Sequence, residues 1–185
     1  MSRRLVILDR DGVINRDSDE FIKSPSEWLP IDGSLEAIGM LSAAGFDVAV
    51  ATNQSGIGRK LLDRPTLAAI HEKMRQAASE KGGDISKIAF CPHHPDDNCD
   101  CRKPKPGLLL DLSRQFGVPL INVPVIGDSA RDIAAARAVN ARPILVLTGN
   151  GDSTAKTFDA DGESVEKYPN LLAVAQRLID ETRDE

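Results

Sequence analysis

Short apolar runs alternate along the chain with stretches in which apolar residues recur every three or four positions. The runs predict strands that are buried on both faces, as in a parallel sheet, and the spaced positions predict amphipathic helices. Predicted strands cover residues 5–8, 46–51, 87–90, 123–126 and 143–147. Predicted helices cover residues 35–44, 63–81, 108–116, 132–139 and 171–178. This alternation has no internal repeat, and it predicts an α/β fold with a doubly wound, mostly parallel sheet.

Three segments interrupt the alternation. Residues 15–30 are polar and contain two prolines, which favours a flap over the end of the first strand. Residues 91–101 gather the cysteines, and residues 149–167 are rich in glycine and acidic residues, which is typical of a mobile connection. The intervals between the strand ends are already filled by predicted elements. We therefore expect a single domain over residues 1–185, without a separate cap domain.

Right-handed crossovers place the turns that follow parallel strands at one edge of the sheet, where ligands bind in such folds. Asp9 and Asp11 follow the first predicted strand, and the later turns bring Thr52, Lys103 or Lys105, and Asp128. An Asp-x-Asp-Gly turn alone is more often a solvated acidic turn. Two neighbouring carboxylates nevertheless repel each other unless a cation lies between them, and Mg²⁺ prefers oxygen ligands. Acids, a hydroxyl and a lysine together predict a magnesium ion that faces a phosphate.

Two acids at this edge also suit phosphoryl transfer. One carboxylate can attack phosphorus and form an aspartyl-phosphate. A second one can protonate the leaving oxygen and later deprotonate water. Asp9 and Asp11 are the candidates for these two roles.

The composition excludes several other functions. The 185 residues carry a net charge of −5, so no basic surface points to nucleic acid or to an anionic membrane. No apolar run approaches the roughly 20 residues of a membrane span. The first residues lack the apolar segment of a signal peptide, so we expect a cytoplasmic protein.

All three cysteines and two of the three histidines lie within residues 91–101. Cys91 and His93, with Cys99 and Cys101, supply the four ligands of a closed zinc site. His94 could replace His93, because spacing alone does not separate neighbours, and free cysteines in a mobile loop are the plain alternative. The third histidine lies on a predicted helix, where packing or solvent exposure is expected rather than metal binding.

Four short motifs occur in this order: Asp9-Arg10-Asp11-Gly12, Thr52-Asn53-Gln54, Lys103, and Gly127-Asp128-Ser129-Ala130-Arg131-Asp132. Their order resembles that of the phosphohydrolases of the haloacid dehalogenase superfamily. The resemblance implies that Asp9 is the nucleophile and a magnesium ligand, and that Asp11 is the general acid/base and coordinates through its backbone carbonyl. It also implies that Thr52 and Lys103 stabilise the transferring phosphoryl group and that Asp128 ligates magnesium. Asp132 is expected at most to support these ligands without binding the metal itself. It is equally well explained as an acid at a helix start, where the helix dipole favours a negative charge.

The cysteine loop runs into Cys101-Arg102-Lys103-Pro104-Lys105-Pro106-Gly107. With the first two motifs, it is similar to the D-glycero-D-manno-heptose 1,7-bisphosphate 7-phosphatases, whose zinc loop is shared with histidinol-phosphate phosphatases. The resemblance implies removal of the C7 phosphate in nucleotide-activated heptose biosynthesis for lipopolysaccharide. It implies that Arg102 recognises the substrate and that residues 17–20 and 53–55 contact it. These residues are Asp17, Ser18, Asp19, Glu20, Asn53, Gln54 and Ser55.

Other functions stay open at this point. A histidinol-phosphate phosphatase shares the same motifs, and a phosphatase of nucleic-acid ends is disfavoured by the negative charge. A non-catalytic, zinc-stapled phosphate-binding module would need neither a nucleophile nor a separate acid. We therefore expect a monomeric enzyme that uses Mg²⁺ and Zn²⁺ and acts on a small sugar bisphosphate. Arg59 either reaches the distal C1 phosphate of that substrate or is a solvated surface residue.

Overall fold

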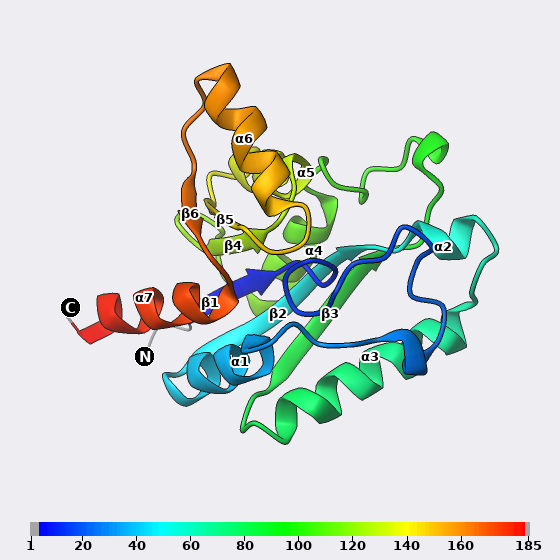
Figure 1. The fold of residues 1–185 in the computed structure, drawn as a ribbon, viewed down its shortest axis with the longest axis horizontal. Coiled ribbons are helices and arrows are strands. Elements are labelled where there is room, and N and C mark those ends of the chain that lie inside the picture. Colours follow the sequence, from blue (N-terminus) through cyan, green and yellow to red (C-terminus); the bar gives the residue numbers. More distant parts are fainter. Residues whose placement is uncertain (1–3, 184–185) are drawn as a thin grey trace.

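A six-stranded parallel sheet forms the centre of the molecule (Figure 1). The computed structural model describes residues 4–183; residues 1–3, which entered the expectation about a signal peptide, and residues 184–185 lie outside this range. The strand order is β3-β2-β1-β4-β5-β6, and every pairing is parallel. The predicted α/β class is confirmed. The strands are β1 (Arg4–Leu8), β2 (Phe46–Asn53), β3 (Ile85–Cys91), β4 (Pro124–Gly127), β5 (Arg142–Val146) and β6 (Glu166–Tyr168).

Helices cover both faces of this sheet. They are α1 (Ser34–Ala43), α2 (Ser55–Gly58), α3 (Arg64–Ser79), α4 (Gly107–Phe116), α5 (Ala130–Arg137), α6 (Gly151–Asp161) and α7 (Leu171–Arg183), with 3₁₀ turns at Pro25–Glu27 and Pro95–Asp97. Helices α1, α3 and α7 pack on one face, and α4 and α5 pack on the other. No helix within residues 4–183 is long and apolar enough to cross a membrane.

The central strand β1 shows why the chain folds in this way. Val6 and Leu8 belong to the core under α1, α3 and α7, whereas Ile7 belongs to the core under α4 and α5. All three side chains are fully buried, and each contributes about 1.5–3 kcal/mol by leaving water. Because alternate residues of a strand face opposite sides, a continuous apolar run is needed here. The chain becomes polar only where β1 ends, at Asp9.

The expectation of a mobile loop over residues 149–167 is wrong. The segment contains α6 and the edge strand β6, which pairs with β5. Helix α6 buries Ala155 and Phe158, three positions apart, against Ile133 and Leu145. It ends at Gly162, whose φ of +71° favours glycine. In the sequence, these two apolar residues stand within a run of charged and small residues, so they give only a weak indication of a helix.

The polar segment 15–30 is a loop that is tied to the body of the protein. Trp28 is only 1% exposed, so it anchors the loop in the core. The ammonium group of Lys73, on α3, donates hydrogen bonds to the backbone carbonyls of Pro25 and Trp28 at 2.6 and 3.0 Å. The predicted flap is therefore held against α3 at residues 25–28, whereas Asp17, Phe21 and Ile22 from its earlier part lie at the edge of the sheet.

Replacement of Phe158 by alanine tests whether α6 is part of the folded structure. The phenyl ring is 7% exposed, and its loss leaves a cavity, so we expect the free energy of unfolding to fall by about 3 kcal/mol. The measurement is urea denaturation followed by circular dichroism. Thr157→Ala, at the exposed neighbouring position, is the matched control and should stay within about 0.5 kcal/mol of the parent. Equal stability of both variants would mean that α6 does not pack as described.

Candidate active site

A cleft at the carboxyl ends of β1, β2 and β4 brings together most of the residues that were predicted from the sequence. Thr52 is fully buried beside this cleft, and Glu20 faces a separate hollow with Glu27 and Leu29. The predicted residues that line the cleft are Asp9, Asp11, Asp17, Ser18, Asp19, Asn53, Gln54, Ser55, Arg102, Lys103 and Asp128. Predicted residues up to 119 positions apart in the sequence, Asp9 and Asp128, therefore meet in one site.

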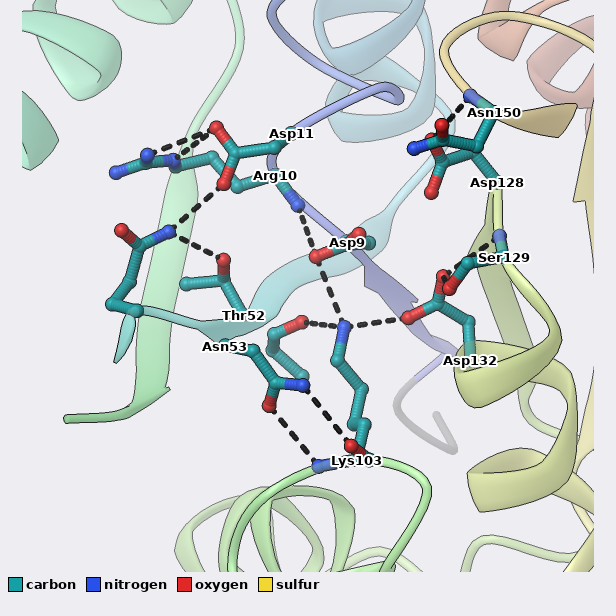
Figure 2. A network of polar contacts seen from close by, with 12 residues as sticks. Asp9, Arg10, Asp11, Thr52, Asn53, Lys103, Asp128, Ser129, Asp132 and Asn150 are labelled. Atoms are coloured by element: carbon teal, nitrogen blue, oxygen red, sulfur yellow. Dashed lines mark hydrogen bonds and ion pairs between the residues drawn. The ribbon is translucent and has the colours of Figure 1, made fainter. Parts of the chain in front are cut away.

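Lys103 lies at the centre of the cleft floor (Figure 2). Its Nζ is 3.0 Å from Asp9 Oδ1 and 2.6 Å from Asp132 Oδ1, and it donates a hydrogen bond to the Ala51 carbonyl at 2.7 Å. Burial opposes the charge of Lys103, but the two carboxylates outweigh burial and raise its pKa. The alternative, Lys105, is exposed and pairs with Asp100 instead. Of these two lysines, Lys103 is thus the one that lies in the site.

The backbone of Lys103 is fixed by β2. The side-chain amide of Asn53 donates to the Lys103 carbonyl at 3.1 Å, and its oxygen accepts from the Lys103 N–H at 3.0 Å. This paired contact uses the Asn53 amide to hold the lysine in place. Asn53 was predicted from the sequence as a substrate contact. Its role as a support for Lys103 has no signal in the sequence.

Asp132 has a larger role in the site than the sequence indicated. It caps α5 through Ser129, whose N–H and hydroxyl donate to Asp132 Oδ2 at 3.1 and 2.7 Å. Its other oxygen holds Lys103, and the residue is only 2% exposed. Asp132 is therefore both the acid that caps the start of α5 and a residue of the site. A methyl group at Gly127 would collide with Asp132, so this close approach requires glycine.

Three carboxylates crowd one side of the cleft. Oxygen atoms of Asp9, Asp128 and Asp132 lie within 4.8 Å of one another. Burial raises the pKa of Asp9 well above its usual range, although Lys103 partly offsets this, and burial raises the pKa of Asp128 to about 6. One lysine cannot neutralise three acids. Such an oxygen-rich, under-compensated cluster fits a divalent hard cation.

The chain also packs closely around Asp128. Its Oδ2 accepts a hydrogen bond from the Asn150 N–H at 2.8 Å. A side chain at Gly12 or at Gly149 would collide with this carboxylate, and both glycines have a positive φ, of +82° and +57°. The glycine after Asp11 is therefore needed both for the turn and for the space that Asp128 occupies.

Asp11 is surrounded by hydrogen-bond donors. Its Oδ1 accepts from Arg10 Nε and Nη2 at 3.2 and 2.9 Å and from Asn15 Nδ2 at 2.9 Å, while its Oδ2 accepts from Gln54 Nε2 at 2.9 Å. Figure 2 shows its carboxylate turned toward the Arg10 guanidinium. Burial alone would raise the pKa of Asp11, but the charge of Arg10 and these donors lower it. Gln54 also donates to the hydroxyl of Thr52 at 2.9 Å, which links the first two motifs.

The cysteine loop forms a compact cluster of ligand atoms. Cys91 Sγ and Cys101 Sγ each lie 3.6 Å from Cys99 Sγ, and His93 Nδ1 lies 3.5 Å from Cys91 Sγ and 3.2 Å from Cys101 Sγ. Tetrahedral zinc with Zn–S bonds of about 2.3 Å separates its sulfur ligands by ~3.8 Å, which these spacings match. Burial, with the neighbouring thiols, raises the pKa of Cys101 to about 12.

The neighbouring histidine, His94, is not part of this cluster. His94 Nδ1 accepts from the backbone N–H of Asp96 at 3.3 Å and caps a 3₁₀ turn. The geometry therefore separates two adjacent histidines that the spacing left equivalent. The four clustered side chains fit a structural zinc ion.

Positive charge gathers on the wall of the cleft next to the cysteine loop. Arg102 Nη1 is buried, and no acceptor for it occurs among the described residues. Burial, followed by the nearby charges of Arg131 and Arg59, lowers the pKa of Arg102. Both Arg102 and Arg131 line the cleft. Within residues 4–183 neither arginine has an acidic partner, so the two like charges provide a place for an anion. Arg131 was not among the residues predicted from the sequence.

Comparison with known proteins gives consistent results. A family model described as HAD-hydrolase-like matches residues 100–171. The D-glycero-beta-D-manno-heptose-1,7-bisphosphate 7-phosphatase of Pseudomonas aeruginosa is 51% identical over 97% of this chain and 99% of its own length. The enzyme of that name from Bordetella bronchiseptica is 49% identical over 96% of this chain and 99% of its own length.

Solved structures agree with these relatives. The crystal structure of D,D-heptose 1,7-bisphosphate phosphatase from B. bronchiseptica, complexed with magnesium and phosphate, has a TM-score of 0.91 and 49% identity. It covers 96% of this chain, and 99% of its own chain is matched. The phosphatase of that name from Burkholderia thailandensis has a TM-score of 0.74 and 41% identity over 96% of this chain and 99% of its own.

The motifs and the cysteine loop had already suggested this group of phosphatases, and the comparisons confirm the resemblance. The match extends over nearly the whole chain at about half identity and includes the same fold. This chain belongs to the D-glycero-beta-D-manno-heptose-1,7-bisphosphate 7-phosphatase family of HAD-like hydrolases.

Proposed function

We propose that this chain is a magnesium-dependent phosphatase that removes the C7 phosphate of D-glycero-D-manno-heptose 1,7-bisphosphate through an aspartyl-phosphate intermediate. The observation that carries the proposal is the buried Lys103 between Asp9 and Asp132, beside a separately held Asp11, in a chain about half identical to enzymes of that name. Since those relatives are named for the β-anomer, we expect the same anomer here.

Asp9 is the nucleophile in this proposal. Its Oδ1 accepts from the Arg10 N–H at 2.8 Å and faces Lys103, so the carboxylate is oriented before substrate binds. Asp9 attacks phosphorus, a new O–P bond forms, and the bond between phosphorus and the sugar C7 oxygen breaks. Asp11 gives its proton to that oxygen and then takes a proton from the water that hydrolyses the aspartyl-phosphate.

The environment of Asp11 determines how this proton cycle begins. Arg10 and the surrounding donors keep the pKa of Asp11 low in the free protein, although burial opposes them, so the carboxylate is ionised. A phosphate dianion bound beside it would raise that pKa, because like charges favour protonation. Asp11 therefore takes up a proton as substrate binds. After it has given this proton to the leaving oxygen, it takes another from the water that hydrolyses the intermediate.

The remaining residues of the cleft hold charge and shape the pocket. Asp9, Asp128 and the backbone carbonyl of Asp11 would hold Mg²⁺, which offsets the charge of the phosphoryl oxygens when it is bound. Thr52 and Lys103 stabilise the transferring phosphoryl group. Arg102, with Arg131 on the same wall, suits the distal C1 phosphate. Sugar contacts come from the remaining proposed residues that line the cleft, namely Asp17, Ser18, Asp19, Asn53, Gln54 and Ser55. Glu20 faces the neighbouring hollow and would contact only a larger substrate.

Zinc has a structural role in this proposal. Cys91, His93, Cys99 and Cys101 would bind Zn²⁺ and fix the loop that continues directly into Arg102 and Lys103. The loop has little apolar core of its own, so the ion would supply its rigidity.

The cellular setting follows from the substrate. We place the enzyme in the cytoplasm, in nucleotide-activated heptose biosynthesis for lipopolysaccharide, as a single phosphatase domain over residues 1–185. The net charge of −5 supports a small-molecule substrate rather than nucleic acid or an anionic membrane. We propose that the enzyme acts as a monomer.

Substrate preference provides the first test. We expect kcat/KM for the heptose bisphosphate to exceed that for histidinol phosphate by at least about two orders of magnitude, or ~3 kcal/mol of transition-state binding. Phosphate release is measured for both heptose anomers and for histidinol phosphate with magnesium present. Asp9→Asn should fold normally and lose turnover. Faster hydrolysis of histidinol phosphate would contradict the assigned substrate, and full activity of Asp9→Asn would contradict the nucleophile.

Arg102 tests recognition of the distal phosphate. Arg102→Ala should lower kcat/KM for the bisphosphate by about 10- to 100-fold, because a charge-assisted hydrogen bond to the C1 phosphate is lost. A heptose phosphorylated only at C7 should lose much less, since it has no C1 phosphate. Arg114→Ala, at an exposed arginine of α4 that does not line the cleft, is the control and should leave both kcat/KM values unchanged. An equal loss with both substrates would assign Arg102 to the reacting phosphate instead.

Zinc removal tests the cysteine loop. We expect a chelator that extracts zinc to lower the melting temperature and the phosphatase activity together, because the loop positions Arg102 and Lys103. Cys99→Ser should reproduce both losses, with metal content measured by mass spectrometry. His94→Ala, beside the cluster but outside it, is the control and should keep a full equivalent of zinc. Zinc-free protein with unchanged melting and kinetics would contradict the proposal.

A further inference from the structure

Arg10 is the most deeply buried charge of the site. It lies between the two motif acids and is only 1% exposed. Two of its nitrogens, Nε and Nη2, bind Asp11 Oδ1 at 3.2 and 2.9 Å. A buried guanidinium needs acceptors for its remaining N–H groups, because it cannot lose its proton. The orientation of Asp11 therefore depends on what holds the other side of Arg10.

A histidine on a distant helix provides that contact. His71 Nε2, on α3, lies 3.3 Å from Arg10 Nη1, 61 positions away in the chain. Because a guanidinium only donates, the ring nitrogen must accept, so His71 is neutral with its hydrogen on Nδ1. Burial, then the charge of Arg10, lower the pKa of His71 to about 3, with Arg75 adding to this and Asp11 opposing it.

The imidazole is itself held firmly. It meets the Phe90 ring of β3 edge to face, with centroids 6.0 Å apart and planes inclined by 63°. Its neighbours Ile70 and Met74 on α3 are fully buried in the core. His71 is 7% exposed and is not one of the residues that line the cleft, so it has no route to direct contact with substrate.

We propose that His71 is a positioning residue for the phosphatase reaction: as a neutral acceptor it holds Arg10, and through Arg10 it keeps the Asp11 carboxylate oriented toward the leaving oxygen. The inference rests on the proposed function in one respect, namely that Asp11 is the general acid. Loss of the acceptor leaves a buried N–H without a partner, and the guanidinium then turns to find one and displaces Asp11.

A histidine that only fills the core would be required equally for every substrate. A positioning role through Asp11 has a different consequence, because a good leaving group departs without a proton. Hydrolysis of p-nitrophenyl phosphate therefore does not need Asp11 as an acid, whereas hydrolysis of a sugar phosphate does. The ratio of the two kcat/KM values isolates this contribution, since kcat/KM excludes the later hydrolysis of the aspartyl-phosphate.

The experiment compares His71→Leu, which removes the acceptor, with His71→Gln, whose side-chain oxygen can still accept from Arg10. We expect His71→Leu to lower kcat/KM for the heptose bisphosphate about tenfold and to leave that for p-nitrophenyl phosphate within about twofold. His71→Gln should restore most of the loss. Ile70→Val, one position away in the same core, is the control and should leave the ratio unchanged. If His71→Leu folds poorly, His71→Asn, which is too short to reach Arg10, replaces it.

A double variant tests whether His71 acts through Asp11. In the Asp11→Asn background, His71→Leu should cause no further loss on the heptose bisphosphate, because the residue it positions no longer functions. Additive losses, or equal losses with both substrates, would overturn the proposal. Absence of heptose bisphosphate turnover by the parent protein would instead contradict the proposed function, so the two failures are distinguishable.

Nitrogen NMR provides a readout that does not depend on activity. Long-range ¹H–¹⁵N spectra of the folded protein should show His71 as the neutral tautomer with an unprotonated Nε2 across pH 5–8. A hydrogen on Nε2 would leave Arg10 without this acceptor and would overturn the proposal.

Discussion

The ion pairs of one buried lysine connect the parts of this site. Lys103 Nζ joins Asp9 from the end of β1 and Asp132 from the start of α5, and its backbone is bound by Asn53 at the end of β2. A buried ammonium is stable only when acids surround it, and the acids are tolerated only because the lysine is there. Each element is thereby held at the edge of the sheet by charges from the others.

Charge is divided unequally across the cleft. On one side, burial and neighbouring acids raise the pKa values of Asp9 and Asp128. Lys103 offsets only part of the rise at Asp9, and hydrogen bonds from Asn150 offset only part of it at Asp128. On the other side, Arg10 and its neighbours outweigh burial and keep the pKa of Asp11 low. The pKa values of Asp9 and Asp11, two residues apart, are therefore shifted in opposite directions. The difference comes from their surroundings, because an acidic cluster surrounds Asp9 and hydrogen-bond donors surround Asp11.

The walls of the cleft come from segments without much core of their own. The 15–30 loop is anchored through Trp28 and Lys73. In the cysteine loop, four side chains that could hold a metal ion lie within 4.8 Å of one another. Helix α6 and the turn before it bring Asn150 onto Asp128. An open cleft is therefore shaped by loops that are individually tied to the α/β body, which leaves room for a sugar between them.

The sequence by itself determined the α/β class, the order of the motifs and the composition of the cysteine cluster, because these depend on local periodicity and on residue type. Only the tertiary structure separated His93 from His94 and Lys103 from Lys105, placed Asp132 on the lysine, and showed that residues 149–167 fold. Each of these outcomes depends on which side chains meet across long stretches of chain. The contact between Arg10 and His71 has the same origin, since no periodicity links residues 61 positions apart that become neighbours only when α3 packs on the sheet.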